Sequence, residues 1–247
     1  MLMQYQIQLE STNVCTAEFA YPLYSALLSY LSPAFATQLH ENQRTPIRHY
    51  LRPTEYGAMW NITALDAQSY TELERCFSTQ QHFILRKFHT QLQVRNIKKT
   101  TIPSIEALFA LVTESSHIHQ LHFQTPTAFH SKKTYVVLPQ PLLILQSISR
   151  TWEQFICPIE DTENRGLQTL AEAALCTKLD VHTTSYPLKT ATVPGVVGSM
   201  TIKNCATGFH QLWLDALLYL AQFTGVGIKT ALGMGGVTHT FVGAQKL

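Results

Sequence analysis

The most constraining feature of this sequence is an amphipathic helix that runs directly into a glycine-rich segment. Residues 209–223 repeat apolar side chains at the spacing of one helical stripe, which predicts a helix packed against a core. The next segment, residues 225–236, contains five glycines. Its backbone must therefore adopt conformations, or make close approaches, that larger residues do not allow. It is not a Walker A loop, because Ile228 interrupts Gly-Lys-Thr.

Two interpretations of the glycine-rich segment stay open at this point. Bare backbone amides beside the single Lys229 could approach a phosphodiester backbone. The alternative is a purely conformational role, in which the glycines end the helix and form a β-bulge.

Composition excludes several classes of protein. The chain of 247 residues is 45% hydrophobic, which is enough for an ordinary core and too much for intrinsic disorder. It has no apolar run of the length needed to cross a membrane, and its first residues do not resemble a signal peptide. The five cysteines are scattered and never form Cys-x-x-Cys, which is typical of a reduced, cytoplasmic protein.

The first half predicts strands and helices in alternation. Strand-like patterns cover residues 4–9, 60–65 and, as a long strand or hairpin, 82–99. Helical patterns cover residues 22–31, 33–40, 69–76 and 104–113, with Ser104 as an N-cap. The cations that follow His40, as far as Arg48, are interpreted as lying within a short loop.

The second half begins the same alternation again. We expect strands at residues 120–129, 135–138 and 196–202, and helices at 142–155, within 158–172 and at 209–223. Pro194-Gly195 is interpreted as a turn before the third of these strands. The predicted fold class is α+β with two similar halves, residues 1–115 and 116–247.

Charge is distributed unevenly along the chain. Residues 153–180 hold six of the sixteen acidic residues, whereas residues 75–105 contain six cations and no carboxylate. The segment from Arg44 to Arg52 is similarly basic. Such stretches could form a positive surface for a phosphate backbone, or they could be an ordinary solvated face.

Metal-dependent chemistry is not favoured. His117 and His119 would share one face of a strand, but His122 would point the other way, and no acidic residue or cysteine nearby completes a ligand set. The four aspartates are dispersed, whereas a two-metal nuclease needs clustered carboxylates. We expect no metal and no other cofactor.

His40 ends a predicted helix and is followed by cations. Cleavage of RNA without a metal needs a base, an acid and positive charge beside the phosphorane, and histidine titrates near neutrality. Without further information, a histidine stabilised by the helix dipole is the favoured explanation.

Four segments, in order along the chain, resemble the CRISPR-associated repeat-processing endoribonucleases of the RAMP superfamily. They are YPLYSALLSYLSPAFATQLH, FQTPTAFHSKKTYVVLPQPLLILQSISRTWEQF, VPGVVGSMTIKN and the tail TGVGIKTALGMGG. The resemblance implies two tandem ferredoxin-like domains (RRM-like and RAMP-like) with a C-terminal glycine-rich loop. It also implies metal-independent cleavage of CRISPR precursor RNA within each repeat, leaving 2′,3′-cyclic phosphate and 5′-hydroxyl ends.

Residue roles follow from the same resemblance. His40 falls at the general acid/base position of the family. Members often carry a lysine shortly after this histidine and a tyrosine before it, and here Arg44, Arg48 and Tyr24 are the candidates to assist. The residues expected to bind RNA are Gly225, Gly227, Lys229, Thr230, Gly233, Gly235, Gly236, Arg52, Arg86, Lys87, Lys132 and Lys133.

The expected partner is CRISPR repeat RNA or its crRNA product, with other effector subunits as further partners and the protein itself a monomer or homodimer. Two other functions stay open. The fold could hold crRNA as an inactive effector subunit, or the protein could be a metal-dependent nuclease.

Overall fold

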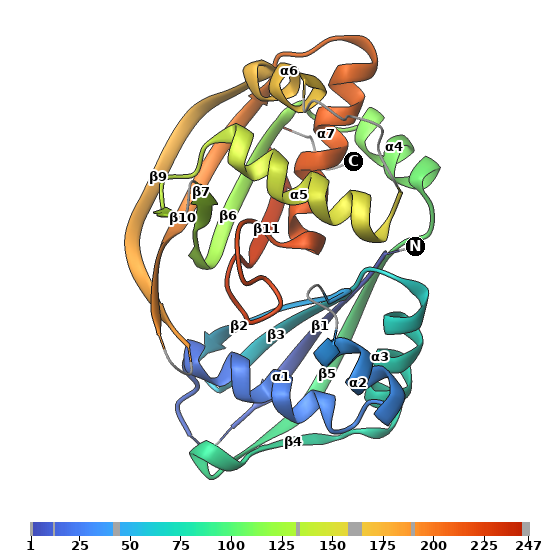
Figure 1. The fold of residues 1–247 in the computed structure, drawn as a ribbon, viewed down its shortest axis with the longest axis vertical. Helices are drawn as coiled ribbons and strands as arrows, with labels where there is room; N and C mark the ends of the chain where they lie inside the picture. Colours follow the sequence, from blue (N-terminus) through green and yellow to red (C-terminus); the bar gives the residue numbers. More distant parts are fainter. Residues whose placement is uncertain are drawn as a thin grey trace.

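The computed structural model describes residues 2–11, 13–41, 45–131, 134–157, 165–188 and 191–243. Two halves are stacked along the long axis of the molecule, each made of an antiparallel sheet with helices packed against it (Figure 1). The N-terminus lies where the halves meet.

The first half contains a five-stranded sheet in the order β2-β3-β1-β5-β4. Its strands are β1 (Leu2–Glu10), β2 (Ile47–Thr54), β3 (Gly57–Ala64), β4 (His82–Leu85) and β5 (Thr90–Ile102). Its helical segments are η1 (Ala17–Phe19), α1 (Ala20–Leu28), α2 (Pro33–Glu41), α3 (Ala67–Thr79) and η2 (Arg86–Phe88). Alternate residues of β1, including Tyr5 and Ile7, face the buried core beneath these helices.

The second half contains a four-stranded sheet in the order β11-β6-β10-β9. Its strands are β6 (Ile118–Thr127), β9 (Ala174–Pro187), β10 (Thr192–Asn204) and β11 (Val237–Phe241), with a separate β7–β8 hairpin (Phe129–Ser131 and Thr134–Val136). Its helices are α5 (Pro141–Phe155), α6 (Arg165–Ala173) and α7 (Gly208–Thr224). Helix α4 (Ile105–Thr113) connects the halves.

Both halves repeat one topology. Each runs strand, helix, strand, strand, helix, strand, and each places its first strand in the middle of the sheet, between the third and the last strand of the motif. This is the split βαβ arrangement of the ferredoxin-like fold. The expected tandem ferredoxin-like architecture is therefore confirmed.

The expected domain boundary at residue 115 stays a prediction. Leu108 and Val112 of α4 are buried in the second hydrophobic core, although α4 lies before that boundary. We propose that the first structural unit ends with β5 and that α4 belongs to the second.

Three sequence-based expectations about elements are wrong. Residues 47–48, expected within a loop, begin strand β2 (Ile47–Thr54), and strands β2 and β9 were not predicted. Pro194 and Gly195 lie within β10 and form no turn. A Cβ on Gly195 would lie 2.9 Å from the backbone nitrogen of Thr127, so this glycine marks a close approach between strands.

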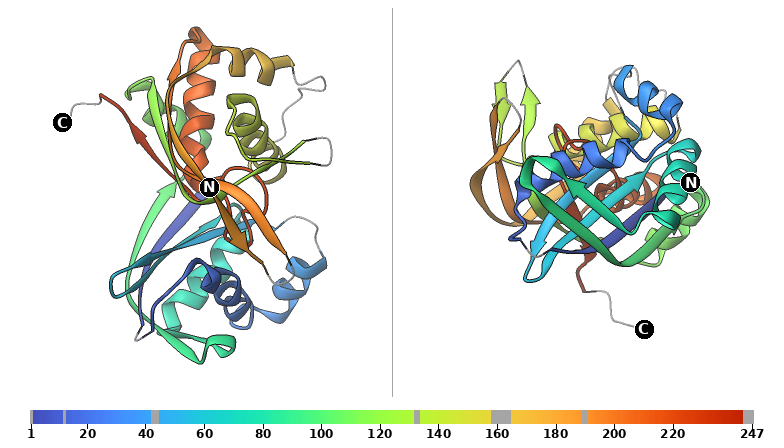
Figure 2. Two further views of the ribbon diagram at one scale, coloured as in Figure 1. Left: turned by 90° about the vertical axis from the view of Figure 1, so that its left-hand side faces the viewer. Right: turned by 90° about the horizontal axis from the view of Figure 1, so that it is seen from below.

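The β9–β10 ribbon spans both halves. It follows one side of the upper half and reaches down to the first half beside α1 (Figures 1 and 2). Around its tip, Tyr186 and Val193 form a small third core with Ala128 and Met234, against which Ala17 of the first half packs. The two halves are therefore joined by packed side chains as well as by the chain itself.

The carboxylate-free stretch 75–105 is not a bare basic surface. Arg75 pairs with Glu72, Arg95 with Glu10, and Lys99 with Glu74. Adjacent strands and α3 bring acids from elsewhere in the sequence beside these cations. These ion pairs engage three of the six cations of the stretch, and its role as an RNA-binding face stays a prediction.

A buried polar network holds the second core. The Asp215 carboxylate accepts hydrogen bonds from His119 Nε2 at 2.8 Å, His117 Nδ1 at 2.7 Å and Asn204 Nδ2 at 2.6 Å, and His119 Nδ1 lies 2.9 Å from His239 Nε2. Burial alone would raise the pKa of Asp215, but the hydrogen bonds from His119, Asn204 and His117 outweigh it and lower that pKa.

This network makes Asp215 a test of the fold. Asp215→Ala should lower the free energy of unfolding by about 3 kcal/mol, because it leaves the buried donors of His119 and Asn204 without an acceptor. Denaturant unfolding measures the loss. Asp180→Ala, which removes an exposed carboxylate from β9, should change stability by less than about 0.5 kcal/mol. Equal effects of the two substitutions would contradict the role of the network.

Candidate nucleic-acid interface

The glycine-rich loop, residues 225–236, is a folded element. It leaves α7 at Gly225 (φ +65°) and returns on itself, so that the Val226 N–H donates to the Gly235 carbonyl at 2.9 Å. Strand β6 and the residue after it hold it from one side: the Ile228 N–H donates to the Ala128 carbonyl at 2.9 Å, and the Gly236 N–H to Thr125 Oγ1 at 2.9 Å. The loop therefore has a fixed shape in the free protein.

The same loop rests on the first half. The His49 N–H of β2 donates to the Thr230 carbonyl at 3.2 Å, and the Tyr186 hydroxyl donates to the Leu232 carbonyl at 3.0 Å. A Cβ on Gly236 would lie 2.3 Å from the Tyr50 ring, so only glycine allows this approach. In Figure 1 the loop descends from the upper half onto the edge of the lower sheet.

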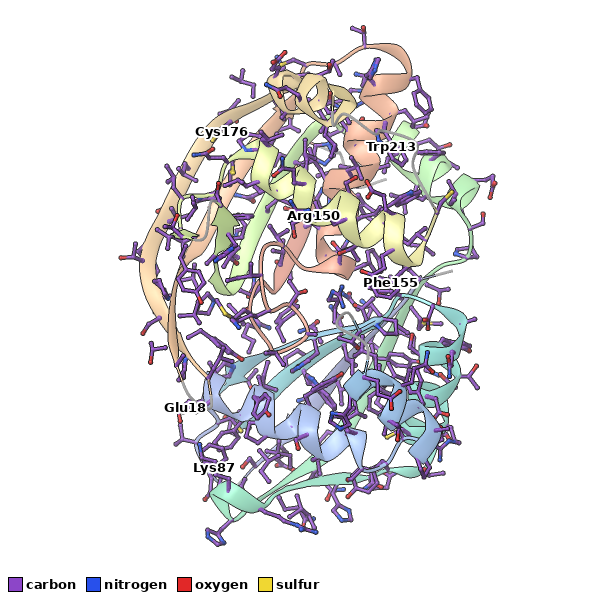
Figure 3. All side chains as sticks on the ribbon, in the orientation of Figure 1. Glu18, Lys87, Arg150, Phe155, Cys176 and Trp213 are labelled. Carbon is purple, nitrogen blue, oxygen red and sulfur yellow. The ribbon has the colours of Figure 1, made fainter. Side chains whose placement is uncertain are left out.

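A cleft of about 300 Å³ opens between this loop, α5 and β2. The cationic side chains in its lining are Arg48, Arg150 and Lys229, joined by His130 and by the polar Gln146, Ser147, Thr151, Gln154 and Thr230. No described residue of the lining is acidic. A cleft with charges of one sign and no carboxylate attracts phosphate groups. Figure 3 places Arg150 and Phe155 along α5, in front of this region.

Arg48 connects the cleft to the first half. Its guanidinium donates to the backbone carbonyls of Thr45 and, at 3.1 Å, of Ile47, and it lies 5.5 Å from the centre of the Phe155 ring. The arginine is half-buried and therefore held in one orientation. Its position on an edge strand, rather than in a loop, provides that rigidity.

Tyr24 does not line the cleft. Its side chain is buried and stacks on His49 with ring centres 4.9 Å apart, while its hydroxyl lies 3.5 Å from Thr45 Oγ1. Burial raises the pKa of Tyr24. Burial also lowers the pKa of His49 to about 3, so that ring is neutral. The expectation that Tyr24 assists catalysis is corrected to a supporting contact with Thr45, whose carbonyl holds Arg48.

His40 lies in the last turn of α2 and is exposed. Its side chain is therefore open to a ligand. Arg44, together with residues 42–43, lies outside the described residues. The described chain resumes at Thr45, the residue on which Tyr24 and Arg48 converge.

The remaining expected RNA-binding residues are dispersed. Arg52 is exposed on β2, two residues beyond Tyr50. Arg86 and Lys87 line a separate groove of about 820 Å³ between α1, β4 and the tip of β9, together with Glu18. Glu18 and Lys87 lie far from Arg150 in Figure 3. Lys132 and Lys133 lie outside the described residues.

The glycines divide into two groups. Gly233, Gly235 and Gly236 are buried against protein atoms, so the expectation that they contact RNA directly is corrected. Their role in this structure is to let backbones and side chains approach closely. Gly225, Gly227 and Thr230 are partly exposed, and Lys229 is exposed with a left-handed backbone (φ +56°). Contact of these four with RNA stays a prediction.

Sequence reasoning missed the contribution of α5. Its apolar stripe was predicted, but the polar side chains of Gln146, Arg150 and Gln154 were not recognised as a second stripe that faces the cleft. Their spacing of four residues places them on one helical face and could have revealed it.

Among the described residues, no group of three or more His, Cys, Asp or Glu side chains could hold a metal ion. In the same part of the chain, no helix combines the length and apolar character needed to cross a lipid bilayer.

The architecture and the cleft together define a class: a tandem ferredoxin-like protein of the RAMP type with a basic cleft beside its glycine-rich loop. Solved structures have the same fold. A Cas6 product complex aligns with a TM-score of 0.80 at 24% identity, covering 97% of this chain and 100% of that one. Thermus thermophilus Cas6 aligns with a TM-score of 0.72 at 24% identity, covering 97% of this chain and 98% of that one.

Sequence comparison finds similar proteins of one family. The family model for the CRISPR-associated endoribonuclease Cas6 matches residues 121–237. A protein of that description from Streptococcus thermophilus is 23% identical over 234 residues, which is 89% of this chain and 90% of that protein. One from Mycobacterium tuberculosis (strain CDC 1551 / Oshkosh) is 25% identical over 223 residues, which is 87% of this chain and 69% of that protein. This chain is therefore similar to the CRISPR-associated endoribonucleases over most of its length.

The loop's packing gives a test of its role. Gly235→Ala should lower the free energy of unfolding by about 3 kcal/mol, because the backbone is left-handed (φ +65°) and a Cβ would lie 2.1 Å from the Val226 carbonyl. Gly208 is also left-handed (φ +58°) but has nothing within 4 Å of a Cβ, so Gly208→Ala should cost only about 1 kcal/mol. If thermal unfolding ranks the two variants in the opposite order, the close packing of the loop is wrong.

Proposed function

We propose that this protein cleaves CRISPR precursor RNA within its repeats to release guide crRNAs. The observation that carries the proposal is the acid-free cleft of Arg48, Arg150 and Lys229, built by the two halves and the glycine-rich loop of a chain that is similar to the Cas6 family. Relatives described as endoribonucleases align over most of this chain, which supports the same class of reaction here.

The proposed chemistry uses the 2′-hydroxyl of the RNA as nucleophile and no metal. Its oxygen attacks the adjacent phosphorus while the bond to the 5′-oxygen breaks, which leaves a 2′,3′-cyclic phosphate and a 5′-hydroxyl. One proton leaves the 2′-oxygen and one reaches the 5′-oxygen. His40 is the proposed group for one of these transfers, because its imidazole is exposed at the end of α2.

The proposed role of Arg48 is to stabilise the negative charge that develops on the phosphorane. Its guanidinium is oriented by two backbone carbonyls before substrate arrives, so little reorganisation is needed when charge develops. Arginine keeps its proton in proteins, which makes it a stabiliser of charge and a poor proton donor. Arg44 is a second candidate for the same role.

RNA would be held mainly through its backbone. Arg150 and Lys229 supply charge on opposite walls of the cleft, and Gln146 and Gln154 add hydrogen-bonding groups along α5. Contacts of this kind suit a short RNA helix, which proteins recognise by shape and phosphate position more than by sequence.

The first experiment is cleavage of labelled repeat RNA in the presence of EDTA. Wild type should cut once, and His40→Ala should slow the single-turnover rate by about 10²–10⁴-fold while RNA affinity stays unchanged. His182→Ala, which removes an exposed histidine from β9, should cleave at the wild-type rate.

Other outcomes of this experiment would replace the proposal. Binding by wild type without cleavage would favour an inactive crRNA-holding effector subunit. Activity that EDTA abolishes would favour a metal-dependent nuclease. Loss of both binding and cleavage in His40→Ala would remove the acid/base assignment of this histidine.

Salt dependence tests the cleft independently of catalysis. Lys229→Ala and Arg150→Ala should each weaken RNA binding and reduce the slope of log affinity against log salt by about 0.7–0.9, the contribution of one phosphate contact. Lys178→Ala removes an exposed cation of β9 outside the cleft and should leave both quantities unchanged. Unchanged slopes in the two cleft variants would contradict the proposed RNA path.

A further inference from the structure

One side chain of α5 touches the glycine-rich loop in an unusual way. Ser147 Oγ accepts a hydrogen bond from the Gly227 N–H at 2.8 Å and donates one to the Gly227 carbonyl at 3.3 Å. A single hydroxyl thus satisfies both backbone groups of one loop residue. Ser147 also lies in the wall of the cleft, between Gln146 and Arg150 along the helix.

Gly227 is the residue from which the exposed tip of the loop departs. It has a left-handed backbone (φ +88°), and a Cβ there would lie 2.2 Å from the Ala128 carbonyl. Two residues later, Lys229 is also left-handed, and its carbonyl accepts a hydrogen bond from Leu232 at 2.8 Å. The direction of the Lys229 side chain therefore depends on how Gly227 is held.

Holding the loop matters because Lys229 is the loop's only cation in the cleft. The α5 wall carries Arg150, which lies on the same helix as Ser147 and three residues, slightly less than one helical turn, away. A bond from α5 to Gly227 ties the two cationic walls together. Backbone that is already ordered before binding spares the entropy that binding would otherwise cost.

We propose that Ser147 is a positioning residue for RNA binding: through Gly227 it fixes Lys229 relative to Arg150 across the cleft. The proposal rests on the proposed function, because it takes RNA as the ligand of the cleft. The serine itself need not touch the RNA. Its effect is exerted through Lys229.

A double-mutant cycle tests this dependence. Ser147→Ala should weaken repeat-RNA binding about fivefold, while the single-turnover cleavage rate at saturating protein stays within twofold of wild type. In a Lys229→Ala background, the same Ser147→Ala substitution should weaken binding by less than twofold, because the group that Ser147 positions is gone. Ser147→Thr keeps the hydroxyl and should recover most of the lost affinity.

Ser149 provides the matched control. It lies on the same helix and its hydroxyl is also hydrogen-bonded, at 3.0 Å to Glu153, but it touches neither the loop nor the cleft. Ser149→Ala should leave RNA binding unchanged. Circular dichroism and thermal unfolding establish that each variant is folded before its affinity is compared.

The possible results separate the two proposals. Equal losses from Ser147→Ala with and without Lys229 would overturn the positioning role, as would a loss in Ser149→Ala of the same size. No rescue by Ser147→Thr would also overturn it. Failure of wild type to bind repeat RNA would instead overturn the proposed function.

Discussion

The arrangement of the molecule depends on the close packing of one short backbone segment between two sheets. The glycine-rich loop contacts β2 through the Thr230 carbonyl and the Tyr50 ring, and it contacts the second half through Thr125 and Ala128. Side chains at Gly235 or Gly236 would occupy space that is already filled by protein atoms. Because this segment forms one wall of the cleft and β2 contributes Arg48, the position of the cationic groups follows directly from that packing.

Much of the fold could be predicted from local patterns. The Ser104 cap and the alternation of β1 each reflect interactions within a few residues, and the structure has both. The predicted apolar stripe of α7 is present in part: Ala216, Leu217 and Leu220 are buried, whereas Phe209 is exposed. Strand β9 escaped prediction because it is an edge strand whose side chains are exposed on both faces, which removes the alternation that identifies strands. Gly195 misled for a related reason: a glycine that permits contact between strands looks the same in sequence as one that makes a turn.

The candidate site was predictable only in part. His40, Arg48 and Lys229 could be selected because each lies in or beside a segment with a recognisable pattern. Arg150 was not selected: its spacing from Gln146 and Gln154 reveals a polar helix face, but only the fold shows that this face meets a loop that lies far away in the sequence. The distribution of charge along the sequence was the least reliable guide to the surface. Ion pairs such as Arg95 with Glu10 join residues that are distant along the chain. Tyr24 shows the same limit: sequence identifies a tyrosine, but only packing reveals that it is buried against His49.

The β9–β10 ribbon has a mechanical consequence. Its tip packs against Ala17 of the first half and against Met234 of the loop, and Tyr186 adds a hydrogen bond to Leu232. The halves are thus braced on the side opposite their covalent connection through α4. Because the two halves are connected on two sides, they resist moving apart. The width of the gap between them is therefore set before any ligand enters.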